Sequence, residues 1–170
     1  MNIPGAKKRF ILTAAHNLLS QREHTDLKVQ LYKNNEPIDI PKDNVRVSSE
    51  WKNGPGKPHA AASDYGIIFL PDQFQPPVQF QPPGDLGFSL SLGAVERFDC
   101  ELSVTGYRTG STTNDFPSTS TGSCINPIMH ENQLEYDIET EAGLSGSPVW
   151  VGYKTHPTVI AIQYELLSYI

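Results

Sequence analysis

The sequence Leu-Glu-Tyr-Asp-Ile-Glu-Thr-Glu-Ala-Gly-Leu-Ser-Gly-Ser-Pro-Val-Trp-Val occupies residues 134–151. In its first part, the apolar residues Leu134, Tyr136 and Ile138 alternate with acidic ones, and this period of two predicts a half-buried β-strand. Its last part, 148–151, is an apolar run of strand length. A glycine-containing stretch joins the two parts, so we expect a strand, a turn and a second strand.

The same strand signals recur along the rest of the chain. Apolar and polar residues alternate in three further places, at 27–31, 45–47 and 102–104. Apolar runs of strand length lie at 9–13, 66–70 and 158–163. Only 17–22 has the pattern of a helical turn, and no segment has the length of a stable amphipathic helix. We therefore expect an all-β protein whose strands are joined by polar turns.

The bulk composition limits the classes of function. The chain has 170 residues, enough for one ordinary domain or two small barrels with a buried core. A net charge of −6 argues against nucleic acid as a partner, because phosphate binding needs clustered Lys and Arg. The apolar runs are far shorter than the roughly 20 residues of a membrane helix, so we expect no membrane partner.

A proline-rich segment divides the chain. Residues 73–83 contain two copies of Gln-Phe-Gln-Pro-Pro, and paired prolines stop both helices and central strands. We interpret this segment, extended to 73–91, as a stiff linker, with a proline-motif docking site as the alternative. The linker separates an N-terminal half, 1–72, from a C-terminal half, 92–170. The Ser/Thr/Gly-rich stretch 108–123 is expected to be an exposed loop.

Three short motifs contain residues with catalytic chemistry. They are Leu-Thr-Ala-Ala-His-Asn at 12–17, Asp-Tyr-Gly-Ile-Ile-Phe-Leu at 64–70 and Gly-Leu-Ser-Gly-Ser-Pro-Val at 143–149. Each motif alone is usually structural, since a lone histidine, an aspartate at a strand start and a Gly-x-Ser-Gly turn are all common. Their order is more informative, because a Ser-His-Asp triad can run His, then Asp, then Ser along the chain.

The nucleophile elbow of the α/β-hydrolases is excluded as a rival. That motif is Gly-x-Ser-x-Gly, and Ser147 stands where its second glycine is needed. The α/β-hydrolase order also requires an acidic residue and then a histidine after the serine. After Ser145 the candidates are His156 and Glu165, which come in the reverse order.

Together, the three motifs resemble those of the chymotrypsin-like (trypsin-like) serine proteases, and of their glutamyl-endopeptidase-like branch in particular. Residues 12–16 are similar to the family's histidine motif, 64–70 to its aspartate strand and 143–149 to its nucleophile loop. Residues 136–140 are similar to the strand that enters this loop. The resemblance covers most of 8–163 and implies two antiparallel six-stranded β-barrels of the chymotrypsin type.

The resemblance also implies a catalytic apparatus. His16, Asp64 and Ser145 match the triad, in which the histidine takes the proton of the serine hydroxyl and the aspartate orients the imidazole. The backbone N–H groups of Gly143 and Ser145 match the oxyanion hole. The implied activity is that of a serine endopeptidase, which needs neither a metal nor an organic cofactor and acts on a protein or peptide substrate.

The substrate preference is a separate hypothesis. Thr140 and Gln163 match the two positions that bind the substrate carboxylate in glutamyl endopeptidases. The family usually has histidine where this chain has Gln163, and glutamine donates a hydrogen bond but carries no charge. Cleavage after glutamate is therefore expected only if this neutral pair can hold the carboxylate.

Few residues precede His16 and few follow Ser145, so we expect a version of the fold truncated at both ends. The N-terminal residues lack the apolar core of a signal peptide, whereas the resemblance implies an extracellular protein. Three hypotheses stay open: an active endopeptidase, a catalytically impaired pseudoprotease that acts as a binding protein, and a truncated fragment. Cys100 and Cys124 are a candidate disulfide, with two free thiols as the alternative. We expect a monomer, although no sequence feature sets the oligomeric state.

Overall fold

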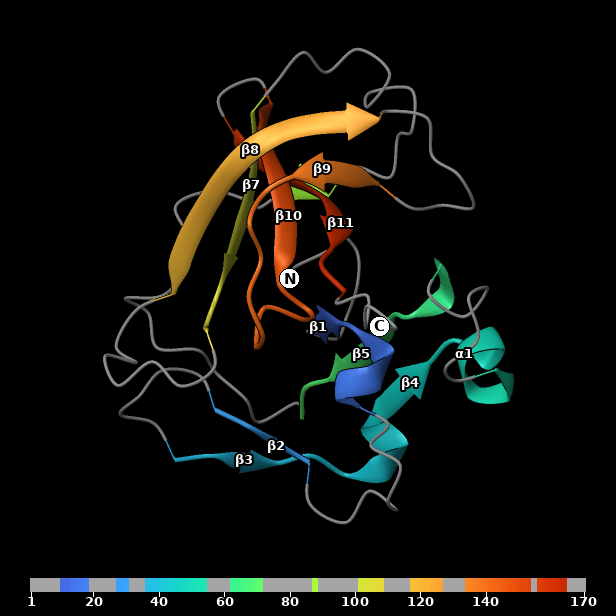
Figure 1. Cartoon of the computed structure of the whole chain (residues 1–170). Coiled ribbons are helices and arrows are strands. Elements are labelled where there is room, and N and C mark those ends of the chain that lie inside the picture. Colours follow the sequence, from blue (N-terminus) through green and yellow to red (C-terminus); the bar gives the residue numbers. More distant parts are fainter. Residues whose placement is uncertain are drawn as a thin grey trace.

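The computed structural model describes residues 10–18, 27–30, 36–54, 62–71, 87–88, 101–108, 117–126, 134–153 and 156–164. Within these ranges the protein is mostly β-strand with little helix (Figure 1). The elements of the N-terminal half are β1 (Phe10–Thr13), η1 (Ala15–Asn17), β2 (Lys28–Val29), β3 (Ile38–Asp39), η2 (Lys42–Asn44), β4 (Val45–Val47), α1 (Ser49–Asn53) and β5 (Gly66–Phe69). They are followed by β6 (Gly87–Phe88), β7 (Glu101–Gly106), β8 (Ser118–Asn126), β9 (Glu135–Asp137), β10 (Pro148–Tyr153) and β11 (His156–Ile162).

A small antiparallel sheet organises the N-terminal half. Its strand order is β1-β5-β4, and β2 pairs with β3 in a separate two-stranded ladder. The β1–β5 register runs from Phe10 opposite Phe69 to Thr13 opposite Gly66. Four buried aliphatic side chains form the core of this half: Leu18, Ile40, Ile68 and Leu70. Their removal from water is the main force that holds the sheet, η1 and the β2–β3 ladder together.

The strands of the C-terminal half form a curved six-stranded sheet in the order β6-β11-β10-β7-β8-β9, in which β6 comes from the segment 73–91 that the sequence analysis interpreted as a linker. The long β8 arches over its neighbours, so the sheet forms a half-barrel (Figure 1). A second core belongs to this sheet, with Leu102, Val104, Ile138, Val149 and Val151 buried together. The β10–β11 hairpin shifts register between Val149 and Trp150, an irregularity of the kind that increases the local twist of a strand pair.

The fold confirms the expected all-β character and corrects two details. Residues 118–123, expected in an exposed loop, form most of β8 and pair with β7 from Glu101 to Gly106. The Ser/Thr-rich composition led to the wrong prediction of a loop, because threonine is a good strand former once a partner strand is present. The second correction concerns strand direction, since β11 pairs with β6 in parallel rather than antiparallel fashion. The proline-rich segment 73–83 lies outside the described residues.

None of the helices in the described ranges is long and apolar enough to cross a membrane. A short 3₁₀ helix, η1, spans Ala15–Asn17, and of the helical turn expected at 17–22, residues 19–22 lie outside the described part.

Candidate active site

Strand register brings His16 and Asp64 together. Thr13, the last residue of β1, lies opposite Gly66, the first residue of β5. His16 comes three residues after this pair in η1, and Asp64 comes two residues before it. The two segments leave the same end of the sheet, so residues distant in sequence become neighbours.

Two hydrogen bonds join the two residues. The backbone N–H of His16 donates to Asp64 Oδ1 at 2.9 Å, and His16 Nδ1 lies 2.6 Å from Asp64 Oδ2. The Asp64 side chain is only 3% exposed, whereas that of His16 is 32% exposed. A carboxylate only accepts hydrogen bonds, so this contact places a proton on Nδ1 and leaves Nε2 as the basic nitrogen of the neutral ring.

Ser145 lies in a tight loop between β9 and β10. The loop contains two glycines with positive φ, Gly143 at 99° and Gly146 at 87°, which other residues rarely adopt. Leu144 is 2% exposed and anchors the loop in the protein interior. Its backbone N–H donates to Glu141 O at 3.2 Å, and the N–H of Ser147 donates to Leu144 O at 2.9 Å. The loop therefore presents half-buried Ser145 between two turns.

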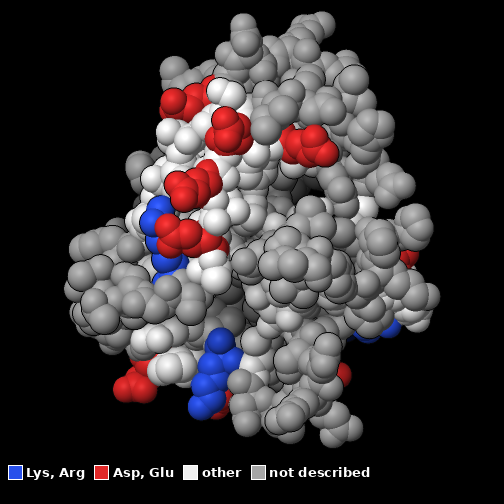
Figure 2. All heavy atoms as spheres, viewed as in Figure 1, with Lys and Arg blue, Asp and Glu red and all other residues white. Residues whose placement is uncertain are grey.

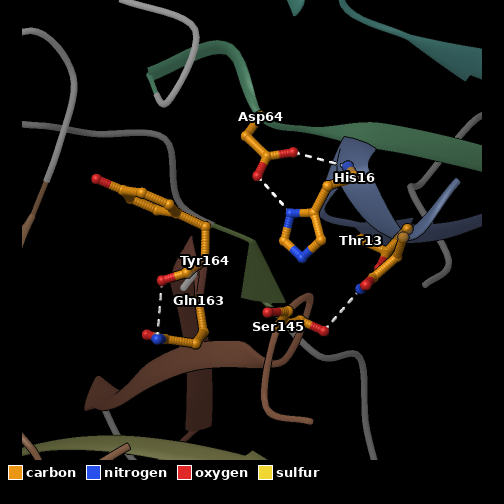
Figure 3. A network of polar contacts seen from close by, with 7 residues as sticks. Thr13, His16, Asp64, Ser145, Gln163 and Tyr164 are labelled. Carbon is orange, nitrogen blue, oxygen red and sulfur yellow. Dashed lines mark hydrogen bonds and ion pairs between the residues drawn. The ribbon is translucent and has the colours of Figure 1, made fainter. Parts of the chain in front are cut away.

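The end of β11 holds the loop from the other side. Gly146 N–H donates to Gln163 O at 2.7 Å, and Gln163 N–H donates to Ser147 O at 2.8 Å. Figure 3 shows Ser145 below the imidazole of His16, on the side of the ring away from Asp64. The described residues thus bring an acid, an imidazole and a hydroxyl to one place from three separate segments.

The backbone N–H groups of Gly143 and Ser145 donate no hydrogen bond within the described part of the chain. The neighbouring N–H groups of Leu144, Gly146 and Ser147 are all engaged. The loop therefore keeps two donors available beside the serine.

The residues proposed for substrate recognition lie on either side of the loop. Thr140 is exposed and precedes it, whereas Gln163 is 7% exposed and follows β11. Gln163 Nε2 donates to Tyr164 O at 2.9 Å (Figure 3). Within the described ranges, no hydrogen bond joins Thr140 to Gln163, and the amide nitrogen expected to hold a carboxylate is bonded to the main chain.

Tyr164 also lies near the site, and no sequence motif predicted it there. Its half-buried ring lies to the Asp64 side of the site (Figure 3). Burial raises the pKa of the Tyr164 phenol, and the negative charges of Asp64 and Glu135 raise the pKa further. The phenol therefore stays neutral beside Asp64 at physiological pH.

Trp51 was also missed. Its ring centroid lies 6.4 Å from that of His16, with the planes tilted by 53°. The helix that carries Trp51, α1, begins with a cap in which Ser48 Oγ accepts from Glu50 N–H. Ser63 donates its hydroxyl to the Glu50 carboxylate, so α1 is fastened directly beside Asp64. A single tryptophan far from any motif carries no sequence signal for this position.

Asn17, the residue after His16, connects the two halves. Its Nδ2 donates to the backbone oxygen of Ser145 at 2.7 Å. The approach is close because Gly146 has no side chain: a Cβ there would lie 2.8 Å from Asn17 Nδ2 and 3.2 Å from Ala14 N. The sequence contained one hint, the position of Asn17 within the histidine motif, but the bond itself depends on how the halves dock.

Acidic side chains lie along the strand that leads to the loop. Four exposed acidic residues stand at every second position, at 135, 137, 139 and 141, and the first three are separated by half-buried Tyr136 and buried Ile138. Figure 2 shows acidic side chains gathered on this face of the C-terminal half. Arg108 offsets part of the charge, because its Nη1 lies 2.6 Å from Glu141 Oε1.

The remaining candidate sites are a metal site and a disulfide between Cys100 and Cys124. Within the described ranges, no three His, Cys, Asp or Glu side chains lie close enough to hold a metal ion. Cys124 belongs to β8, where its Cα lies opposite Tyr136, whereas Cys100 lies outside the described residues. The candidate disulfide therefore stays a prediction.

No family model and no curated protein matches this chain.

Proposed function

We propose that this chain is a serine endopeptidase that uses Ser145, His16 and Asp64 to hydrolyse peptide bonds. The observation that carries the proposal is the short contact between His16 Nδ1 and the buried Asp64 carboxylate, at 2.6 Å, with the Ser145 loop beside the opposite ring nitrogen. A histidine held in this tautomer can accept a proton at Nε2, which is what a serine nucleophile requires.

In the proposed reaction, Ser145 Oγ attacks the scissile carbonyl carbon while His16 Nε2 takes the hydroxyl proton. The C–N bond then breaks, and His16 returns this proton to the leaving amine, so that an acyl ester remains on Ser145. Water attacks the ester and gives a proton to His16, which passes it back to Ser145 Oγ as the carboxylic acid leaves. Asp64 keeps the imidazole oriented and stabilises its protonated form.

The available N–H groups of Gly143 and Ser145 support an oxyanion hole for the tetrahedral intermediates. Loss of one donor of this kind typically lowers the rate by roughly 10²–10³-fold. The proposal extends to the features that the family resemblance implies: two six-stranded barrels as the complete fold, a protein or peptide substrate and an extracellular location.

Cleavage after glutamate is the less supported part of the proposal. Recognition of a carboxylate by Gln163 would require its Nε2 to leave Tyr164 O, a bond of 2.9 Å. The same observation favours the second candidate function, a pseudoprotease that binds proteins without cleaving them. A peptide-library digest separates these functions. Cuts enriched after Glu support both the activity and the preference, cuts without this enrichment support the activity alone, and a folded chain that makes no cut favours the pseudoprotease.

The proposal is tested by treating the folded protein with a fluorophosphonate probe and locating the label by mass spectrometry. Label on Ser145 that is absent from Ser145→Ala and weaker in His16→Ala is the expected result, because the probe reacts with a serine activated by its base. Gly143→Val should also reduce labelling, since a side chain there displaces the loop from its positive φ. A folded chain that takes no label on Ser145 contradicts the proposal and leaves the binding-protein alternative.

A further inference from the structure

The peptide group that follows Ser145 is held at both of its polar atoms. Its carbonyl oxygen accepts from Asn17 Nδ2 at 2.7 Å, and its N–H, which belongs to Gly146, donates to Gln163 O at 2.7 Å. The first bond comes from the N-terminal half, across 128 positions of sequence, and the second from the C-terminal half. The two halves therefore hold opposite sides of one peptide unit.

Planarity turns these two bonds into a constraint on the serine. A peptide group is rigid and planar, and its plane includes the Cα atoms of both flanking residues. Fixing the carbonyl oxygen and the N–H together fixes the orientation of that plane, and Ser145 Cα belongs to it. The position of Ser145 Oγ then depends on only two rotations, about the Cα–C and Cα–Cβ bonds of Ser145.

Asn17 is well placed to set the distance between base and nucleophile. It is the last residue of η1, and His16 is its immediate neighbour in the same short element. Any shift of the N-terminal half that moves His16 also moves Asn17, which remains bonded to the carbonyl of Ser145. A second, longer contact from Asn17 Nδ2 to Thr13 Oγ1, at 3.4 Å, orients the amide.

We infer that Asn17 is a positioning residue, which holds the Ser145 peptide in register with His16. The inference rests on the proposed endopeptidase function, because it assigns Asn17 a role in that reaction. Among the described residues, Asn17 Nδ2 bonds to the Ser145 carbonyl and to Thr13 Oγ1, so Asn17 would act on the nucleophile through that carbonyl.

The test uses Asn17→Asp, which keeps the shape of the side chain but removes the donor that faces the carbonyl. Asn17→Ala is the second variant and removes the donor without adding a charge. Asn44 offers a matched control, because its Nδ2 donates to Phe69 O at 2.8 Å entirely within the N-terminal half. Asn44→Asp therefore loses the same kind of bond, with the same change of charge, away from the loop.

Two measurements are made on each folded protein. The first is the rate of Ser145 labelling by the fluorophosphonate probe, together with kcat and KM on any peptide that the wild type cleaves. The second is hydrogen–deuterium exchange over 143–147, where the N–H groups of Gly146 and Ser147 are hydrogen-bonded. The exchange measurement needs no enzymatic activity.

Both Asn17 variants should label about 10- to 100-fold more slowly, with the loss in kcat and not in KM, because a displacement of about 1 Å can cost 10²-fold in rate. Exchange at Gly146 and Ser147 should become faster in the same variants. Asn44→Asp should match the wild type in both measurements, although it melts at a lower temperature.

The two measurements distinguish failure of the proposed function from failure of the inference about Asn17. If the folded wild type takes no label, the proposed function is wrong, and the exchange data alone decide whether Asn17 anchors the loop. Exchange in both Asn17 variants equal to that of the wild type would overturn the inference. Faster exchange with an unchanged labelling rate would also overturn it, because the loop would then be anchored by Asn17 without any consequence for the nucleophile.

Discussion

Gly146 occupies a position where a methyl group has no room, so Gly146→Ala tests the docking of the two halves directly. A Cβ at this position would lie 2.8 Å from Asn17 Nδ2, and it would approach Thr13 Oγ1 still more closely. Ordinary van der Waals contact for such an atom begins at 3.4 Å. The backbone φ of 87° adds a second obstacle, since L-residues rarely adopt this region.

The expected cost has two parts. A left-handed conformation costs a residue other than glycine about 1–2 kcal/mol, and overpacking of a close contact typically costs about 1–3 kcal/mol. Together they predict that Gly146→Ala lowers the free energy of unfolding by about 2–5 kcal/mol. Relief of the contacts requires the loop to move by about 1 Å, which predicts a loss of about 10²-fold in the rate of Ser145 labelling.

Urea denaturation measures the first quantity and fluorophosphonate labelling the second. Gly152→Ala is the matched control, because Gly152 lies in β10 with no positive φ and a Cβ there would have nothing within 4 Å. Its stability and its labelling rate should both stay close to those of the wild type. The double variant Thr13→Ala with Gly146→Ala should recover part of the lost stability, since the closest contacting atom is removed.

A Gly146→Ala variant that equals the wild type in both stability and labelling rate would contradict this prediction. That result would mean that the loop does not abut η1 and the end of β1. If the double variant is as destabilised as Gly146→Ala alone, the destabilisation comes from the backbone conformation alone. The proposed contact with Thr13 would then be wrong.

Two further predictions concern ring systems. Burial, with the nearby Tyr164 contributing, raises the pKa of Tyr136 from 10.0 to about 12, so its contribution to stability is fully present below pH 10 and is lost between pH 10 and 12. Between pH 10 and 12 the wild type should lose at most about 2 kcal/mol of unfolding free energy, measured by urea titration, and Tyr136→Phe should not show this loss. Tyr107→Phe, at an exposed position, should show the same loss as the wild type. In a Trp150→Phe background, the emission spectrum of Trp51 should change on His16→Ala, because the two ring centroids lie 6.4 Å apart; an unchanged spectrum in the folded variant would contradict the ring contact.

Local pattern predicted most of the strands. The alternation at 45–47 and 102–104 and the apolar runs at 9–13, 66–70 and 148–151 all fall within or overlap observed strands, because side-chain period and strand geometry are local properties. Strand pairing is not local, which explains why β8 was expected to be a loop. Its Ser/Thr-rich sequence forms a strand by pairing with β7, and residues 118–126 have no alternation of apolar residues from which this strand could be predicted.

The candidate site divides in the same way. His16, Asp64 and Ser145 were predicted from short motifs, whose residue types are dictated by the chemistry that they would perform. Asn17 and Trp51 were not predicted, because their roles depend on contacts made after the segments have folded. An asparagine next to a histidine is unremarkable until a carbonyl from the other half arrives 2.7 Å from its amide nitrogen.

Two sets of contacts hold the site together: contacts within each half, and contacts between the halves. Their loss should affect stability and activity differently. The His16–Asp64 contact follows from β1–β5 register, and the shape of the Ser145 loop follows from bonds to Gln163 and Ser147, so each is maintained within its own half. The distance between them depends on the Asn17 bond and on the bare backbone of Gly146. Substitutions within either sheet should lower stability and activity together. Loss of the exposed Asn17 bond should lower activity far more than stability, because hydrogen bonds at exposed positions contribute little to folding, whereas catalysis is sensitive to small displacements.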